Sequence, residues 1–142
     1  CTINSKSEIF FPDPEAEDPW QVEELRSPSN SRKIISDATS GIKTLEIFDD
    51  FGAWKDADHG LVNDIVAREV WEINPDDPIS AKASTHWTTR NMRDKWSVRT
   101  ETYTTMTSDV ENFYITARLE AFEAGVLVFE KDVKKTILRD TR

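Results

Sequence analysis

The sequence predicts an all-β fold, an antiparallel meander of about six long strands that forms a curled or barrel-like sheet. An extended, acidic, proline-rich segment precedes it. Two observations support this fold: apolar and polar residues alternate over five runs between residues 65 and 140, and short turns separate the runs. Alternation with a period of two places successive side chains on opposite faces of a sheet, and short turns make neighbouring strands antiparallel.

The expected strands of the second half follow directly from these runs. Their ranges are 66–73, 79–89, 96–106, 113–121 and 126–137, separated by turns at 74–78, 90–95 and 123–125. One face of the resulting sheet should be apolar, and we expect it to hold the core residues Trp71, Trp87, Trp96, Phe113, Leu119 and Phe129. The other face carries charges of both signs that can pair across strands, and two interpretations of it stay open: a solvated outer surface or the lumen of a barrel or half-barrel.

The first half is less regular. Residues 2–11 have the composition of one strand, whereas residues 12–30 contain four prolines and a cluster of acids, which is typical of an extended linker. A turn at 36–41 precedes an expected strand at 42–48, and residues 49–63 have the composition of a polar loop. We therefore divide the chain into a strand with an extended linker, residues 1–33, and an antiparallel β domain, residues 34–142.

Length and composition limit the class of protein. A chain of 142 residues is long enough for one domain, and it has no apolar run of the roughly 20 residues that a membrane span needs. The only cysteine is Cys1, so no intrachain disulfide can form. Cys1 could be a lipidated terminus, a reactive thiol or the point at which a longer chain was cut, and we expect the last.

The charge is uneven along the chain. The net charge is −9, and residues 1–65, with 14 acidic and 6 basic residues, account for −8 of it. An acidic surface repels phosphate backbones, and no basic stripe with interleaved aromatic residues occurs in the sequence. We therefore expect no nucleic-acid partner.

The motifs of catalysis are absent from the sequence. It has no G-x-S-x-G nucleophile elbow, and its four glycines are too far apart to form a phosphate-binding loop. His59 and His86 are isolated and predict no zinc site, while Asp76 and Asp77 lie between prolines as turn formers. The sequence thus predicts no catalytic residue, no cofactor and no metal.

Five aromatic and aliphatic residues of the irregular segments are candidates for an interface. Trp20 and Trp54 lie outside the alternating strands, and the run Ile9, Phe10 and Phe11 forms an apolar edge that the linker cannot cover. We expect these residues to contact another domain or a second copy of the chain, so that the isolated chain is at least partly dimeric.

Several spaced runs of the sequence resemble the extreme C-terminal region of CocE/NonD-type, X-Pro dipeptidyl-peptidase-like hydrolases. The runs are REVWEINPDDPISA at 68–81, WSVRTET at 96–102, ARLEAFE at 117–123, ILRD at 137–140 and TSGIKTLEIFDDFG at 39–52, together with the acidic proline-rich stretch 12–28. Full-length members carry an α/β-hydrolase domain with a Ser-Asp-His triad and then a jelly-roll domain. The resemblance implies that this chain is the β region after the jelly roll, and none of its positions matches the triad.

Two functions remain open from the sequence. In the first, the chain is a non-catalytic accessory domain that packs on the catalytic α/β-hydrolase and jelly-roll domains of a parent chain. In the second, it is an independent small-ligand-binding β-barrel, for which Cys1 could be the lipidated end of a secreted lipoprotein. A reading frame that continues upstream of Cys1 into a G-x-S-x-G motif would indicate the first, and a signal peptide ending at Cys1 would indicate the second.

Overall fold

The computed structural model describes residue 11 and residues 13–140. These residues form eight β-strands and no helix. The strands are β1 (Val22–Arg26), β2 (Ser29–Ser36), β3 (Lys43–Asp56), β4 (Val62–Asn74), β5 (Asp77–Arg93), β6 (Trp96–Ser108), β7 (Asn112–Glu123) and β8 (Val126–Leu138). The predicted all-β, antiparallel fold is thus confirmed.

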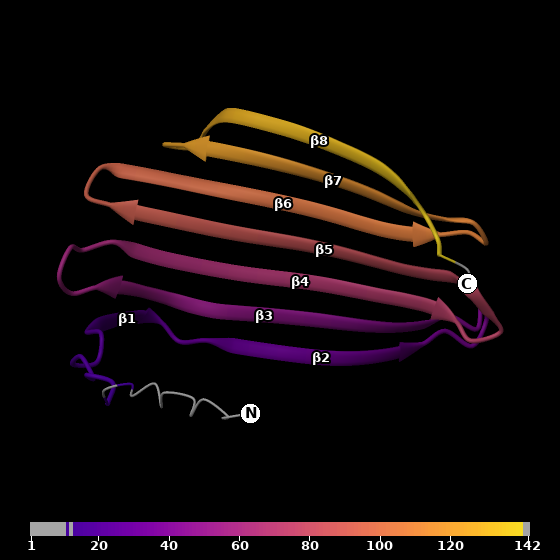
Figure 1. Ribbon diagram of the computed structural model, residues 1–142, viewed down its shortest axis with the longest axis horizontal. Helices are drawn as coiled ribbons and strands as arrows, with labels where there is room; N and C mark the ends of the chain where they lie inside the picture. Colours follow the sequence, from indigo (N-terminus) through magenta and orange to yellow (C-terminus); the bar gives the residue numbers. More distant parts are fainter. Residues whose placement is uncertain (1–10, 12, 141–142) are drawn as a thin grey trace, which may run out of the picture.

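All eight strands belong to one curled antiparallel sheet that does not close into a barrel (Figure 1). From β3 to β8 each strand pairs with the next, which is the predicted meander. The short strands β1 and β2 both pair with β3, β1 beside its C-terminal half and β2 beside its N-terminal half. One edge of the sheet is therefore shared by β1 and β2, and β8 forms the other.

The register separates the side chains into two faces. We call the apolar face the one that carries Leu45, Ile47, Phe51, Ile65, Ala67, Trp71, Ile73, Ala83, Trp87, Trp96, Met106, Phe113, Ile115, Leu119, Phe129 and Val133. We call the charged face the one that carries Asp50, Asp64, Arg68, His86, Arg90, Arg99, Glu101, Arg118, Glu120, Glu130 and Asp132. The alternation in the sequence predicts these faces correctly for Trp71, Trp87, Trp96, Phe113, Leu119 and Phe129 and for Arg68, Arg99, Glu101, Arg118, Glu120 and Glu130, whereas Asp50 and Phe51 lie in the stretch that was expected to be a loop.

Residues with a positive φ form two of the tight turns. Asp94 (φ 54°) turns β5 into β6, and Ala124 (φ 48°) with Gly125 (φ 82°) joins β7 to β8. Positive φ at both central residues is the type I′ geometry, whose twist matches that of the flanking strands. The last turn therefore holds β7 and β8 in register.

The prediction of a loop at residues 49–63 is wrong. Residues 49–56 continue β3 and residues 62–63 begin β4, leaving a turn of only a few residues between them. The pairing of β3 with β4 shifts between Asp50 and Gly52, which marks a β-bulge at Phe51. The bulge lets a polar, glycine-containing stretch remain in the sheet, because the extra residue and the positive φ of Gly52 (87°) absorb the irregularity.

The acidic segment expected as a linker, residues 12–30, contains β1 and the first residues of β2. Pro28 lies between these strands at the sheet edge, where its missing N–H removes no bond from an interior ladder. The proposed domain boundary at residue 33 falls within β2. The strand expected at residues 2–11 lies outside the described residues except for Phe11.

The expected burial of the six core residues is wrong. They share the apolar face, but Trp71, Trp87, Trp96 and Phe129 are 37–50% exposed. Among the described residues only Ala53 and Ala67 are buried apolar residues, and no large side chain is fully buried. The physical reason is that the described residues form a single layer, and a sheet needs a second layer to bury a face.

Candidate functional site

A network of ion pairs crosses the charged face from β1 to β5. The guanidinium of Arg26 contacts Asp50 at 2.8 Å and Asp64 at 2.6 Å, and Arg90 contacts the other carboxylate oxygen of Asp64 at 3.1 Å. Asp64 is buried, whereas both arginines are partly exposed. The network ties the edge strand β1 to the centre of the sheet.

A second cluster surrounds the buried Glu101 on β6. Its carboxylate accepts a hydrogen bond from the Thr88 hydroxyl at 2.6 Å, lies 2.7 Å from Nε2 of His86 and pairs with Arg99 at 2.5 Å. The His86 ring stacks on Tyr103 of the next strand with 4.3 Å between the ring centroids. In a hydrolase triad the histidine lies between the carboxylate and the hydroxyl, whereas here Thr88 donates directly to the carboxylate.

A third cluster covers β7 and β8. Arg118 contacts Glu120 at 2.7 Å, Glu130 at 2.9 Å and Asp132 at 3.7 Å. The predicted pairing of opposite charges across strands is therefore present. Because the sheet does not close, the charged face is not the lumen of a barrel.

The buried carboxylates of Asp64 and Glu101 should make the folded state less stable at acid pH. Burial opposes ionisation of Glu101, but hydrogen bonds from Thr88 and His86 and the charge of Arg99 outweigh it and lower its pKa. The hydrogen bond from Arg26 lowers the pKa of Asp64 despite burial. A carboxylate whose pKa is lower in the folded state than in the unfolded state stabilises the fold. This stabilisation is fully present above the unfolded-state pKa, about 4 for these groups, and it is lost as the pH falls through the folded-state pKa.

We therefore expect the free energy of unfolding in urea to fall as the pH is lowered below about 4. The double variant Asp64→Asn, Glu101→Gln should start lower at neutral pH and should show a flatter decline. Equal pH slopes for the two proteins would contradict the role of these carboxylates.

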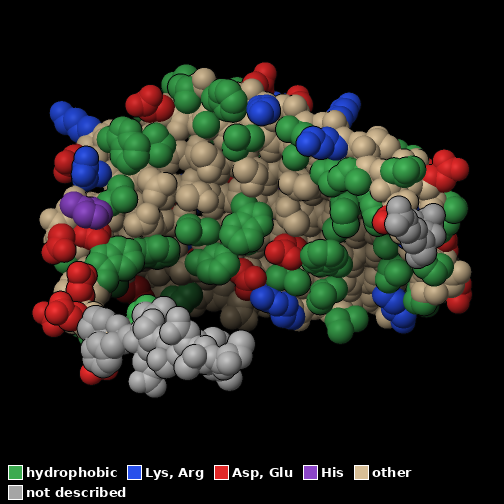
Figure 2. Space-filling model, in the orientation of Figure 1, with side chains coloured by type: hydrophobic (Ala, Val, Ile, Leu, Met, Phe, Trp, Pro, Cys, Tyr) green, Lys and Arg blue, Asp and Glu red, His purple; other side chains and the backbone are tan. Residues whose placement is uncertain are grey.

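The apolar face is largely open to solvent. Figure 2 shows several groups of hydrophobic side chains on one side of the sheet, separated by other side chains and backbone, with most charged side chains nearer its margin. Phe51 stacks on Trp87 at 5.8 Å between centroids, yet both remain more than a third exposed. Monomeric soluble proteins rarely expose large contiguous apolar patches, and such patches mark interaction sites.

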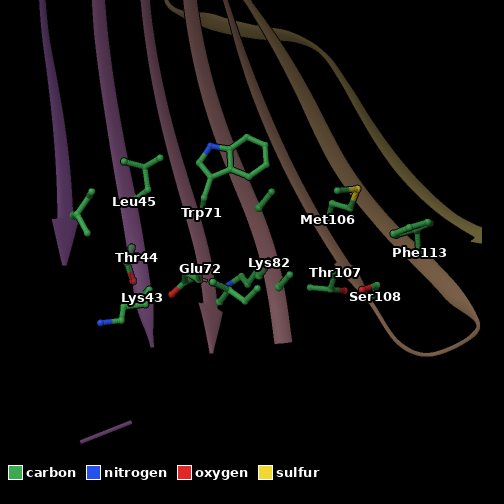
Figure 3. A pocket seen from close by; sticks show the side chains of 14 residues that line it. Lys43, Thr44, Leu45, Trp71, Glu72, Lys82, Met106, Thr107, Ser108 and Phe113 are labelled. Carbon is green, nitrogen blue, oxygen red and sulfur yellow. Dashed lines mark ion pairs between the residues drawn. The ribbon is translucent and has the colours of Figure 1, made fainter. Parts of the chain in front are cut away.

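One end of the apolar face is hollowed into a groove of about 430 Å³ (Figure 3). Its lining comes from six strands, β2 to β7, and its large apolar residues are Ile34, Leu45, Trp71, Ile73, Met106 and Phe113. Ala81 and Ala83 of β5 lie between these larger residues, so their small side chains leave room for an occupant. The groove falls in the size range of ligand pockets.

Of the five candidate interface residues, the structure describes Phe11, Trp20 and Trp54. The indole N–H of Trp20 donates to a carboxylate oxygen of Asp56, while the Trp20 side chain remains 59% exposed. The indole nitrogen of Trp54 is buried without a partner among the described atoms. Phe11 is exposed, and Ile9 and Phe10 lie outside the described residues.

Asp56 organises the turn between β3 and β4. Its carboxylate accepts hydrogen bonds from the backbone N–H groups of Asp58 and His59, and Nε2 of His59 lies 3.3 Å away. These contacts, with that of Trp20, explain a carboxylate that is only 3% exposed. His59 therefore lies in a structured turn, as its sequence context predicts.

Asp77 starts β5 and its side chain accepts a hydrogen bond from the N–H of Ile79, which is a turn-forming contact.

Sequence reasoning missed the groove. Its row of residues comes from strands far apart in the sequence, and only the register brings Ile34, Leu45, Trp71, Ala83 and Met106 into line. The signal available in the sequence was the pair of alanines at 81 and 83, close in the sequence to the large apolar residues Trp71, Ile73 and Ile79.

Over residues 13–140, no three or more His, Cys, Asp and Glu side chains are grouped as a metal site would require. In the same part of the chain no helix has the length and hydropathy needed to cross a bilayer. Searches with the chain found no matching protein-family model, no matching curated protein and no matching solved structure.

Proposed function

We propose that this chain is a non-catalytic accessory β domain of a CocE/NonD-type serine hydrolase and that its apolar face packs on the catalytic part. The resemblance of the sequence runs supplies the kind of parent protein. The observation that supports packing on the catalytic part is the exposure of Trp71, Trp87 and Phe129, which lie on a face with almost no buried apolar residue.

The two faces of the sheet differ in whether their side chains already have suitable partners. On the charged face the buried carboxylates Asp64 and Glu101 already have arginine partners. That face therefore needs no further protein layer to neutralise its buried charges. On the apolar face, covering the exposed side chains would contribute about 25 cal/mol for each Å² removed from water. A covering layer on that face would therefore supply the hydrophobic stabilisation that the single sheet lacks.

The test begins with the gene. A reading frame that continues upstream of Cys1 into a G-x-S-x-G sequence supports the accessory role, and the encoded full-length protein then allows a direct measurement. Trp87→Asp on the apolar face should make the β domain easier to release by limited proteolysis and should lower the melting temperature. Leu127→Asp, on the charged face and similarly exposed, is the matched control. Equal effects of the two substitutions would contradict packing through the apolar face.

A second candidate function, the binding of a small ligand, is favoured by one observation. The groove near Trp71 and Ala83 is preformed and almost entirely apolar. Because the sheet is open, the ligand would lie in this groove and not in a barrel lumen.

Catalysis by the chain alone should be absent. We expect no turnover of a p-nitrophenyl ester or an acyl-Pro-nitroanilide above the buffer rate, since the sequence holds no nucleophile elbow. The measurement is the release of nitrophenol or nitroaniline by the purified chain. A rate that disappears on mutation of one Ser or His would contradict this proposal.

The oligomeric state tests the interface role of the N-terminal residues. We expect the full chain to be at least partly dimeric in sedimentation velocity, and a version starting at Gln21, which lacks Trp20 and the preceding residues but keeps β1, to contain less dimer. A monomeric full chain would remove the argument for an interface at Ile9, Phe10, Phe11, Trp20 and Trp54.

A further inference from the structure

The groove on the apolar face runs across six strands, from β2 to β7. A single cross-strand row runs along it from Ile34 through Leu45, Trp71 and Ala83 to Met106, and Phe113 lies at the far end (Figure 3). Neighbouring strands are about 4.8 Å apart, so five spacings from β2 to β7 correspond to about 24 Å measured along the sheet. The site therefore has the length of an extended aliphatic chain.

The volume of the groove indicates the size of that chain. Its 430 Å³ is nearly three times the roughly 150 Å³ of an apolar protein cavity that binds benzene. Scaled from the six carbon atoms of benzene, this ratio corresponds to about 17 carbon atoms. Ala83 is essential to this space, because a larger side chain there would fill the middle of the row.

A cation without an acidic partner lies at one end of the groove. Lys43 lines the groove, and its Nζ donates to the hydroxyl of Ser36 at 2.8 Å. Among the described residues no carboxylate lies within ion-pair distance of Lys43, whereas the other lysine of the lining, Lys82, pairs with Glu72 at 3.3 Å. In a chain of net charge −9, this end of the apolar groove is complementary to a single negative charge.

We propose that the groove binds a free long-chain fatty acid, with its chain along the row from Leu45 to Met106 and its carboxylate against Lys43. The length and apolar lining of the groove select the aliphatic chain, and Lys43 selects the anionic head. This inference rests on the second candidate function, ligand binding in the groove, and specifies its ligand.

The test is titration calorimetry of the whole chain with octanoate, dodecanoate and tetradecanoate below their micellar concentrations, and with dodecan-1-ol as the neutral analogue. The affinity should rise steeply with chain length, by at most about fourfold for each added methylene. Lys43→Gln should weaken dodecanoate about threefold, the value of an exposed ion pair, and should leave dodecan-1-ol unchanged. Lys55→Gln, on the same strand at the other end of the sheet, is the matched control and should change neither ligand.

A second pair of variants tests the place of binding. Ala83→Trp should abolish binding of all the ligands, whereas Ser84→Trp, whose side chain lies on the opposite face, should leave it intact. Far-UV circular dichroism and the melting temperature check that each variant is folded.

The outcomes separate the failure of this inference from the failure of ligand binding itself. If dodecan-1-ol binds with sensitivity to Ala83→Trp but Lys43→Gln affects neither ligand, the groove binds apolar ligands and the fatty-acid assignment is wrong. If none of the ligands binds, or if Ala83→Trp and Ser84→Trp act alike, ligand binding in the groove is wrong as well.

Discussion

Replacing Gly52 with valine is expected to lower the free energy of unfolding by about 3 kcal/mol. Gly52 follows the bulge of β3 and has a φ of 87°, a conformation that L side chains rarely adopt. A Cβ at this position would lie 2.5 Å from the carbonyl oxygen of Arg26 and 3.1 Å from the backbone nitrogen of Pro28. Both neighbours are backbone atoms, so relief of the clash requires β1 and the start of β2 to move away from β3.

Gly41→Val is the matched control for this prediction. Gly41 has a φ of 74°, but the nearest atoms to an added Cβ are side-chain atoms of Asn74 at 3.8 Å. Its cost should be limited to backbone strain, about 1–2 kcal/mol. Urea unfolding of both variants measures the difference, and hydrogen exchange should show faster exchange in β1 for Gly52→Val alone. Equal losses would mean that the close approach of Arg26 and Pro28 contributes nothing.

The second large effect concerns Asp64. Asp64→Ala is expected to cost about 2–3 kcal/mol, because it removes the carboxylate that two arginines share. Arg26 keeps Asp50, but Arg90 loses its carboxylate partner and lies directly opposite Arg99 in the pairing of β5 with β6. Like charges at opposed positions are destabilising, so the loss should be partly recovered at high salt.

Asp132→Ala provides the comparison. Its carboxylate is 67% exposed and lies 3.7 Å from Arg118, so its removal should change the free energy of unfolding by less than about 0.5 kcal/mol. In a double-mutant cycle, Arg90→Ala should cost less in the Asp64→Ala background than in the natural sequence. Additive losses would show that Asp64 and Arg90 do not interact, which would contradict the shared ion pair.

Sequence patterns were reliable in the second half of the chain and less reliable in residues 22–56. In β4 to β8 the alternation and the short turns correctly predicted the strands and the meander. In residues 22–30 and 49–56 the acids, Pro28 and Gly52 resembled linker or loop composition. An edge strand tolerates a proline and a bulged strand tolerates a glycine, because neither requires an uninterrupted ladder of backbone hydrogen bonds.

The sequence by itself determined the strand type, the antiparallel order and the two contrasting faces, since these follow from the local period of two and from turn length. Only the tertiary structure decided that the sheet stays open, that Trp71 and Trp87 remain exposed, and that Ile34, Leu45, Ala83 and Met106 line one groove. Periodicity states which side chains share a face, but register and curvature, which depend on contacts between distant strands, decide what that face encloses.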